Sequence, residues 1–323
     1  MTREDVTLAR LVKLAMSADE GTSPEQANLA RRHLIEKVAF GFLWLSGIAA
    51  VAVLLSVVGY VVVQGAKVLN WEFLTTPPAG GLAASDVGGM STTIVSTIYL
   101  VFWVIVIAGP LGVLAAVYLV EYAEEMAGGT GVIPTLVSIV RFAVEILAGV
   151  PSIIFGLFGY ALFVSAVALG WSFGLRSAAV TGACLVLPVI IRASEEAIRA
   201  VPRSYREASL ALGATKWQTA WKVVLPAAAP GIITGIVLSV GRVVSETAVF
   251  FVTFGGTVRA PDSLFDLSSP GRSMALHVYY LAMETRAFEK AMGTGAVLIL
   301  TIILINLVIN VVSRRLTSKL KGR

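Results

Sequence analysis

Charge is scarce in this sequence, and its scarcity excludes a water-soluble fold. Of the 323 residues only 14% are Asp, Glu, Lys or Arg, whereas 57% are hydrophobic, and the mean hydropathy is +0.84. A soluble chain needs more polar surface than this, and a disordered chain needs fewer apolar residues. The composition therefore predicts an integral membrane protein.

Residues that carry catalytic chemistry are also few. Cys184 is the only cysteine, so no disulfide can form within the chain, and the only histidines are His33 and His277. We expect both histidines outside the membrane, where they cannot serve as a base or metal ligand at membrane depth. None of the eight lysines is followed by Ser or Thr, so the Gly-Lys-[Ser/Thr] end of a phosphate-binding loop is missing. The sequence therefore predicts no enzyme activity, no metal and no cofactor in this chain.

Long intervals without a charged residue predict about six membrane-spanning helices in an all-α fold. The weakest interval, 177–191, is short and contains Pro188, so we expect its span to begin near Trp171 and to use Arg176 and Arg192 as interfacial anchors. The expected spans within a permease domain of residues 38–315 are 38–64, 91–120, 146–169, 172–192, 229–252 and 291–313.

The positions of the basic residues predict the orientation of these spans. With six spans, both termini lie on the same side as the loops at 121–145 and 192–222, and that side holds 18 of the 25 Lys and Arg residues. Basic residues accumulate in cytoplasmic segments, so we expect a cytoplasmic tail at 1–37 and a basic cytoplasmic tail at 316–323. The net charge of +5 is therefore explained by orientation and not by nucleic-acid binding.

The loop at 193–226 has the pattern of a helix, a glycine and a second helix on the cytoplasmic face. Pro202 is expected to end one helix, and Ser204 to cap the next with Glu207 in a capping box. Gly213 is expected to stop that helix and Thr215 to cap a further turn. By composition alone this element could be an amphipathic interfacial helix or a docking element for another protein.

The residues of this loop resemble the EAA signature of binding-protein-dependent ABC importer permeases. The signature is Glu-Ala-Ala, three residues, Gly, nine residues and Ile-x-Leu-Pro. Here Glu207-Ala-Ser-Leu-Ala-Leu-Gly213 is followed by Val223-Val-Leu-Pro226, with Ser209 and Val223 as the departures. The resemblance implies that a coupling helix docks on a separate ATPase subunit through Glu207, Ala208, Ser209 and Gly213.

Two charged residues, Arg242 and Glu246, lie within the span expected at 229–252. A charge at the bilayer centre costs on the order of 3 kcal/mol, so both should face the bundle interior or an aqueous path. Their spacing of four predicts one shared helix face. The pair could serve packing alone, or it could line a path for a polar substrate.

Longer segments resemble the A-type permease of the Pst inorganic phosphate importer. They begin at Leu147-Ala-Gly-Val-Pro151, Leu187-Pro-Val-Ile-Ile-Arg192, Gly241-Arg-Val-Val-Ser-Glu246 and His277-Val-Tyr-Tyr280, with departures at Ser245 and Val249. The resemblance covers roughly residues 34–315 and implies a MetI-like fold in a bacterial inner membrane. It places Arg242 and Glu246 on the substrate path. Guanidinium groups suit phosphate oxygens, and a carboxylate tolerates phosphate through the proton of the substrate.

The same resemblance implies the partners. These are a second, homologous permease, two ATPase subunits, an extracytoplasmic phosphate-binding protein, the lipid bilayer and phosphate itself. An ABC permease for another small solute or oxyanion remains an alternative, since the EAA loop is shared across such permeases. A secondary transporter is a further alternative, although it would not need that loop.

Overall fold

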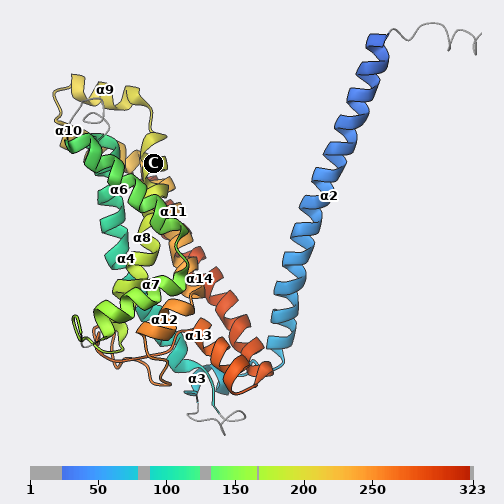
Figure 1. The fold of residues 1–323 in the computed structure, drawn as a ribbon, viewed down its shortest axis with the longest axis vertical. Coiled ribbons are helices and arrows are strands. Elements are labelled where there is room, and N and C mark those ends of the chain that lie inside the picture. Colours follow the sequence, from blue (N-terminus) through green and yellow to red (C-terminus); the bar gives the residue numbers. More distant parts are fainter. Residues whose placement is uncertain (1–23, 79–87, 124–131, 166, 321–323) are drawn as a thin grey trace, which may run out of the picture. The chain divides into compact units, whose positions relative to one another are not determined.

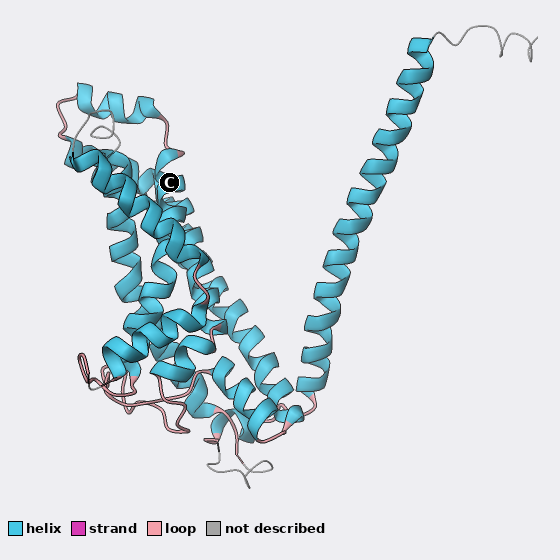
Figure 2. Ribbon diagram, viewed as in Figure 1, coloured by secondary structure: helices cyan, strands magenta, loops and turns pink. Residues whose placement is uncertain are grey.

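The computed structural model describes residues 24–78, 88–123, 132–165 and 167–320. Within these ranges all regular structure is helical, and only two isolated bridges, Pro78 with Gly88 and Gly255 with Gly271, pair extended backbone (Figure 2). The chain divides into two compact units, Met1–Tyr60 and Val61–Arg323. The all-α prediction is confirmed. Most of the expected tail at 1–37, and the end of the tail at 316–323, lie outside the described residues.

Four of the described helices continue into a short segment with π-helical geometry, labelled η. In order the helices are α2 (Pro24–Ala66), α3 (Trp71–Thr75), α4 (Ser91–Val117) with η1 (Tyr118–Tyr122), α6 (Val132–Gly149), α7 (Ser152–Gly159) with η2 (Tyr160–Val164), α8 (Leu175–Arg199), α9 (Arg203–Ala211), α10 (Lys216–Thr219) with η3 (Ala220–Val224), α11 (Leu225–Ser245), α12 (Ala248–Thr253), α13 (Met274–Tyr279) with η4 (Tyr280–Glu284), and α14 (Phe288–Leu320).

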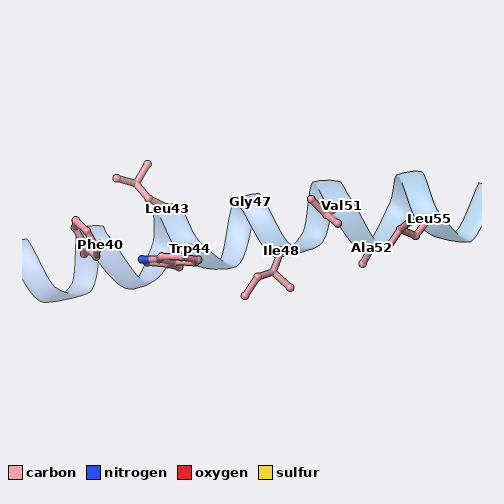
Figure 3. A pocket seen from close by; sticks show the side chains of 8 residues that line it. All are labelled: Phe40, Leu43, Trp44, Gly47, Ile48, Val51, Ala52 and Leu55. Carbon is pink, nitrogen blue, oxygen red and sulfur yellow. The ribbon is translucent and has the colours of Figure 1, made fainter. Parts of the chain in front are cut away.

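Helix α2 exposes an apolar surface. Trp44, Leu45 and Val53 are each 64–65% exposed, and the other large apolar side chains of residues 38–57 are exposed as well. Figure 3 shows eight residues along this stretch, none of which is charged. No Asp, Glu, Lys or Arg occurs between residues 38 and 66. Such a surface is stable against hydrocarbon and not against water, so the stretch is suited to cross a bilayer.

Five helical segments are long and apolar enough to cross a membrane, and a bent helix pair brings the number to six. The five are Ile35–Ala66, Ser91–Tyr122, Leu175–Arg199, Lys216–Ser245 and Phe288–Val311. The short interval at 177–191 lies in the third of these, α8. At its N-terminus Arg176 donates to the Trp171 carbonyl at 2.8 Å and lies over the Trp171 ring. The prediction of about six spans is confirmed.

The segment expected as one span at 146–169 is broken in the structure. Val137–Gly149 and Ser152–Val164 meet at an angle of 106°. The break lies at Val150 and Pro151, because proline has no N–H for the helix and disfavours helical backbone in the residue before it. The span expected at 146–169 therefore contains a helix break, and its boundaries stay a prediction.

Helix α8 lies at the centre of the second unit. It packs against α4, α11 and α7, and α11 also packs against α4 and α14 (Figure 1). Its buried Val186 and Ile190 share one apolar core with Leu100 and Val104 of α4 and Phe250 of α12. Helices α9 and α10 lie at one end of this bundle, and α3, α12 and α13 lie toward the other.

Small residues let the helices approach closely. A Cβ atom on Gly159 would lie 2.2 Å from Oγ1 of Thr181, and one on Gly156 would lie 3.1 Å from Cα of Val249. Both glycines therefore allow close packing of helices, as small residues do in membranes. Gly149 has no atom within 4 Å of such a Cβ, so close packing does not explain it.

A polar cluster lies outside the spans, next to α13. The Arg272 guanidinium donates from Nε to the Gly256 carbonyl at 2.8 Å and lies 4.1 Å from the centre of the Tyr280 ring. Its Nη1 lies 3.4 Å from Nδ1 of His277, a side chain that is 3% exposed. Burial, and then the charge of Arg272, lower the pKa of His277 to about 3. His277 is therefore neutral at physiological pH.

This low pKa predicts a pH-dependent stability. The unfolded chain binds a proton at its ordinary pKa of 6.5 and the folded chain only near 3, so stability is complete above about pH 6.5 and falls as the pH decreases toward 3. The expected loss between pH 7 and pH 5 is about 2 kcal/mol. Thermal unfolding of the purified protein at both pH values measures it. His277→Asn should reduce this loss, and an unchanged pH dependence in that variant would contradict the assignment.

Candidate functional site

The loop at 193–226 forms the helix, glycine and second helix that the sequence predicts. Helix α9 runs from Arg203 to Ala211, and Gly213 follows with a φ of +85°, which is left-handed backbone that glycine adopts without strain. The Gly213 N–H donates to the Leu210 carbonyl at 2.9 Å. Gly213 therefore ends the helix as expected.

The two predicted caps have different outcomes. Thr215 Oγ1 accepts from the Gln218 N–H at 3.3 Å and Gln218 Oε1 accepts from the Thr215 N–H at 3.0 Å, which forms a capping box on α10. The capping box expected between Ser204 and Glu207 is wrong. Pro202, with a ψ of 140°, is the N-cap of α9, so the helix starts at Arg203, one residue before Ser204. The Pro202 side chain has no oxygen that could accept a cap bond.

Three of the four predicted coupling residues face away from the chain. Glu207, Ala208 and Gly213 are exposed, whereas Ser209 is partly buried and its hydroxyl lies 2.9 Å from Oγ1 of Thr219. Large side chains beside them are exposed as well, namely Tyr205 at 54%, Leu212 at 88% and Trp217 at 58%. An exposed apolar surface of this kind marks a contact site for another protein or for lipid.

An ion pair that the sequence analysis did not identify holds α9 to the bundle. Arg206 donates to Glu121 of η1 from Nη2 at 2.8 Å and from Nε at 3.0 Å. Its remaining donors reach the carbonyls of Ile198 and Val201, at the end of α8. The two partners are 85 residues apart, so no local spacing in the sequence indicates the pair.

The structure does not place Arg242 and Glu246 on one helix face. Helix α11 ends at Ser245, and Glu246 has extended backbone with a ψ of 129°. The expected i,i+4 relation is therefore wrong, because a helix break lies between the two residues. Among the described residues no ion pair joins Arg242 to Glu246.

The two charges have different surroundings. Oε1 of Glu246 accepts from the N–H groups of Ala248 at 3.0 Å and Val249 at 3.3 Å, so the carboxylate caps the start of α12. Arg242 is exposed on the surface of the chain, on the same side of α11 as Thr234, Leu238 and Ser245, which are exposed as well. A guanidinium in this position needs a partner chain or an aqueous path, because lipid does not solvate it.

The described residues contain no group of three or more His, Cys, Asp and Glu side chains that could hold a metal ion. What the geometry offers is an exposed guanidinium on a membrane helix and, on α9, an exposed surface that could bind another protein.

Comparisons with known proteins identify the family. Residues 126–322 match the family described as "Binding-protein-dependent transport system inner membrane component". A bacterial ABC transporter that imports the acidic polysaccharide alginate contains a chain of similar fold, with a TM-score of 0.56 over 88% of this chain and 99% of that chain, at 15% identity. At this identity the likeness shows the fold alone.

Curated relatives cover most of the chain. The probable ABC transporter permease protein YqgI of Bacillus subtilis is 32% identical over 85% of this chain and 94% of its own length. Phosphate transport system permease protein PstA 1 of Mycobacterium tuberculosis is 34% identical over 86% and 88%, and PstA of Yersinia pestis is 30% identical over 87% and 86%. This chain belongs to the family of inner membrane components of binding-protein-dependent transport systems, and it is a multi-pass membrane protein.

Proposed function

We propose that this chain is a permease subunit of an ATP-driven importer of inorganic phosphate, and that Arg242 and Glu246 lie on the substrate path. The observation that carries the proposal is the exposed guanidinium of Arg242 on α11, which has no carboxylate partner within the described chain. A guanidinium offers paired N–H donors that match the oxygens of phosphate. Relatives named as phosphate permeases support the choice of substrate.

Arg242 lies on the outside of this chain, so another protein surface must enclose a path for phosphate that passes it. A second, homologous permease would supply this surface and would shield the guanidinium from lipid. Glu246 holds the break between α11 and α12 through its bonds to Ala248 and Val249. In this arrangement Arg242 contacts the anion, and Glu246 stabilises the helix break next to it.

Energy for transport comes from two separate ATPase subunits in this proposal. Glu207, Ala208 and Gly213 contact an ATPase subunit, and Ser209 keeps α9 joined to Thr219. An extracytoplasmic phosphate-binding protein delivers the substrate on the other side. The chain itself acts as the non-catalytic transmembrane subunit. A permease for a different small solute is the alternative, and a secondary transporter would require that no ATPase copurifies.

Phosphate uptake by the complete complex in liposomes tests the function directly. We expect labelled phosphate to accumulate when ATP is enclosed on the ATPase side and the loaded binding protein is added on the other. Sulfate, which has no proton to offer a carboxylate at neutral pH, is the matched competitor and should not reduce uptake. ATP-driven uptake of another solute with no phosphate uptake would contradict the choice of substrate and leave the permease function intact.

Cysteine labelling tests the orientation, in which both termini and the α9 loop are cytoplasmic. In a Cys184→Ala background we expect Leu212→Cys to react with a membrane-impermeant maleimide only after the membrane is opened, and Phe265→Cys to react in intact cells. Both parent side chains are well exposed, at 88% and 74%. The reverse pattern would contradict the orientation. Protection of Leu212→Cys by bound ATPase would support docking at α9.

A further inference from the structure

We propose that Arg206 and Glu121 form a joint through which α9 moves the end of α4, and that both are positioning residues for transport. The inference rests on the proposed function, in which an ATPase subunit moves α9. It goes beyond that function because neither residue contacts the ATPase or the substrate in it. The joint lies on the side of α9 that faces the bundle.

The geometry of Arg206 connects three elements at once. Its guanidinium binds one oxygen of Glu121 through two nitrogens, at 2.8 and 3.0 Å, which joins α9 to η1. Nη1 donates to the Val201 carbonyl at 2.7 Å and Nη2 donates to the Ile198 carbonyl at 2.9 Å. Ile198 lies in the last turn of α8, and Val201 follows the end of that helix by two residues. A displacement of α9 would therefore pull on α4 and α8 together.

Burial makes this connection stiff. The side chains of Arg206 and Glu121 are only 19% and 14% exposed. Ile198 and Val201 belong to a buried apolar cluster with Val117 and Val120 at the end of α4. Separating a half-buried ion pair would leave two charges poorly solvated, which is far more costly than breaking an exposed pair. The Arg206–Glu121 ion pair should therefore stay formed while the ATPase subunit moves α9.

Two other polar links near α9 join different parts of the described chain. Ser209 and Thr219, at 2.9 Å, join α9 to α10, its neighbour in sequence. Arg199 and Glu195, which both belong to α8, pair at 3.5 Å. The Arg199–Glu195 pair lies at the same end of α8 and joins two residues of that one helix, so it provides a matched control.

The test uses the complete complex in liposomes, with the variants Glu121→Gln, Arg206→Lys and the control Glu195→Gln. Glutamine keeps the shape of the carboxylate without its charge, and lysine keeps the charge of Arg206 without its planar fork. We expect Glu121→Gln and Arg206→Lys to assemble and hydrolyse ATP but to move about tenfold less phosphate per ATP, the loss expected for a charge-assisted hydrogen bond. Glu195→Gln should keep the ratio of the unmodified complex.

A second readout does not depend on the substrate. Spin labels on Ser204→Cys in α9 and Leu114→Cys in α4, in the Cys184→Ala background, report the distance between the two helices. In the otherwise unmodified complex this distance should stay the same when vanadate traps the ATPase after hydrolysis, and in Glu121→Gln it should change or broaden. If the complex moved no phosphate, the proposed substrate would be wrong, and the distances would still test the joint.

Three results would overturn the joint. The first is a ratio of phosphate to ATP that is unchanged in both variants while only thermal stability falls, since that pattern belongs to a purely structural pair. The second is a label distance that changes on trapping even with the pair intact. The third is loss of assembly in both variants, which would assign the pair to folding.

Discussion

Arg242→Ala is expected to abolish phosphate uptake while the complex still assembles. The guanidinium is exposed on α11 and makes no ion pair within the described chain, so its removal leaves no carboxylate stranded. A hydrogen bond to a charged group contributes about 1.5–3 kcal/mol, so loss of a two-pronged contact should lower uptake on the order of 100-fold. Copurification measures assembly, and uptake of labelled phosphate into liposomes measures transport.

Substitutions at Arg242 and Glu246 separate a substrate role from a packing role. Arg242→Lys keeps the charge but loses the planar fork, so uptake should be impaired in an intact complex. Glu246→Gln keeps an oxygen that can accept from Ala248 and Val249, whereas Glu246→Ala removes the cap, so assembly should fall more in the second variant. Full uptake by the Arg242→Ala, Glu246→Ala double variant would falsify the substrate role of Arg242.

Gly213→Pro is expected to abolish the response of ATP hydrolysis to the loaded binding protein. Proline holds φ near −65°, whereas Gly213 has a φ of +85°, and proline also removes the N–H that donates to the Leu210 carbonyl. The end of α9 must then reform, and the surface that faces the ATPase changes with it. Hydrolysis by the reconstituted complex, with and without loaded binding protein, is the measurement.

Gly213→Asn is the matched control for this change. Asparagine adopts left-handed backbone more readily than other side chains, and no atom lies within 4 Å of a Cβ at this position. Stimulation should therefore persist in Gly213→Asn and be lost in Gly213→Pro. Normal stimulation in the proline variant would show that the geometry at Gly213 does not matter for coupling, and the role of α9 would have to be revised.

Local chemistry explains which features the sequence could predict. The spans follow from runs without charge, and even the short interval at 177–191 lies in a long helix, α8. Gly213 and the Thr215–Gln218 capping box depend on residues at most three positions apart. The EAA spacing of Glu207 to Gly213 is likewise a local pattern. Features that depend only on residues close in sequence can be predicted without knowing how the helices pack.

The wrong predictions concern the residues at which helices begin and end. Ser204 suits an N-cap, but Pro202 starts α9 earlier. The run that contains Arg242 and Glu246 contains no proline from Gly231 to Ala260, so its composition predicts one helix, although α11 ends at Ser245. Helix breaks in membranes are tolerated where side chains or neighbours satisfy the freed backbone groups. The Glu246 carboxylate supplies such bonds. Its spacing of four residues from Arg242 is compatible with an ion pair as well as with this cap, so the sequence does not distinguish the two.

By itself the sequence determined the membrane environment, the six apolar segments and the glycine that ends α9; the residues that would contact an anion or an ATPase stay predictions. Tertiary structure alone decided that Arg242 and Glu246 are separated by a helix break, that α8 is the central helix, and that Arg206 meets Glu121 across 85 residues. The physical reason is the distance along the sequence over which each interaction acts. Hydropathy, caps and turns act over a few residues, whereas packing and ion pairs between helices depend on which segments the fold brings together.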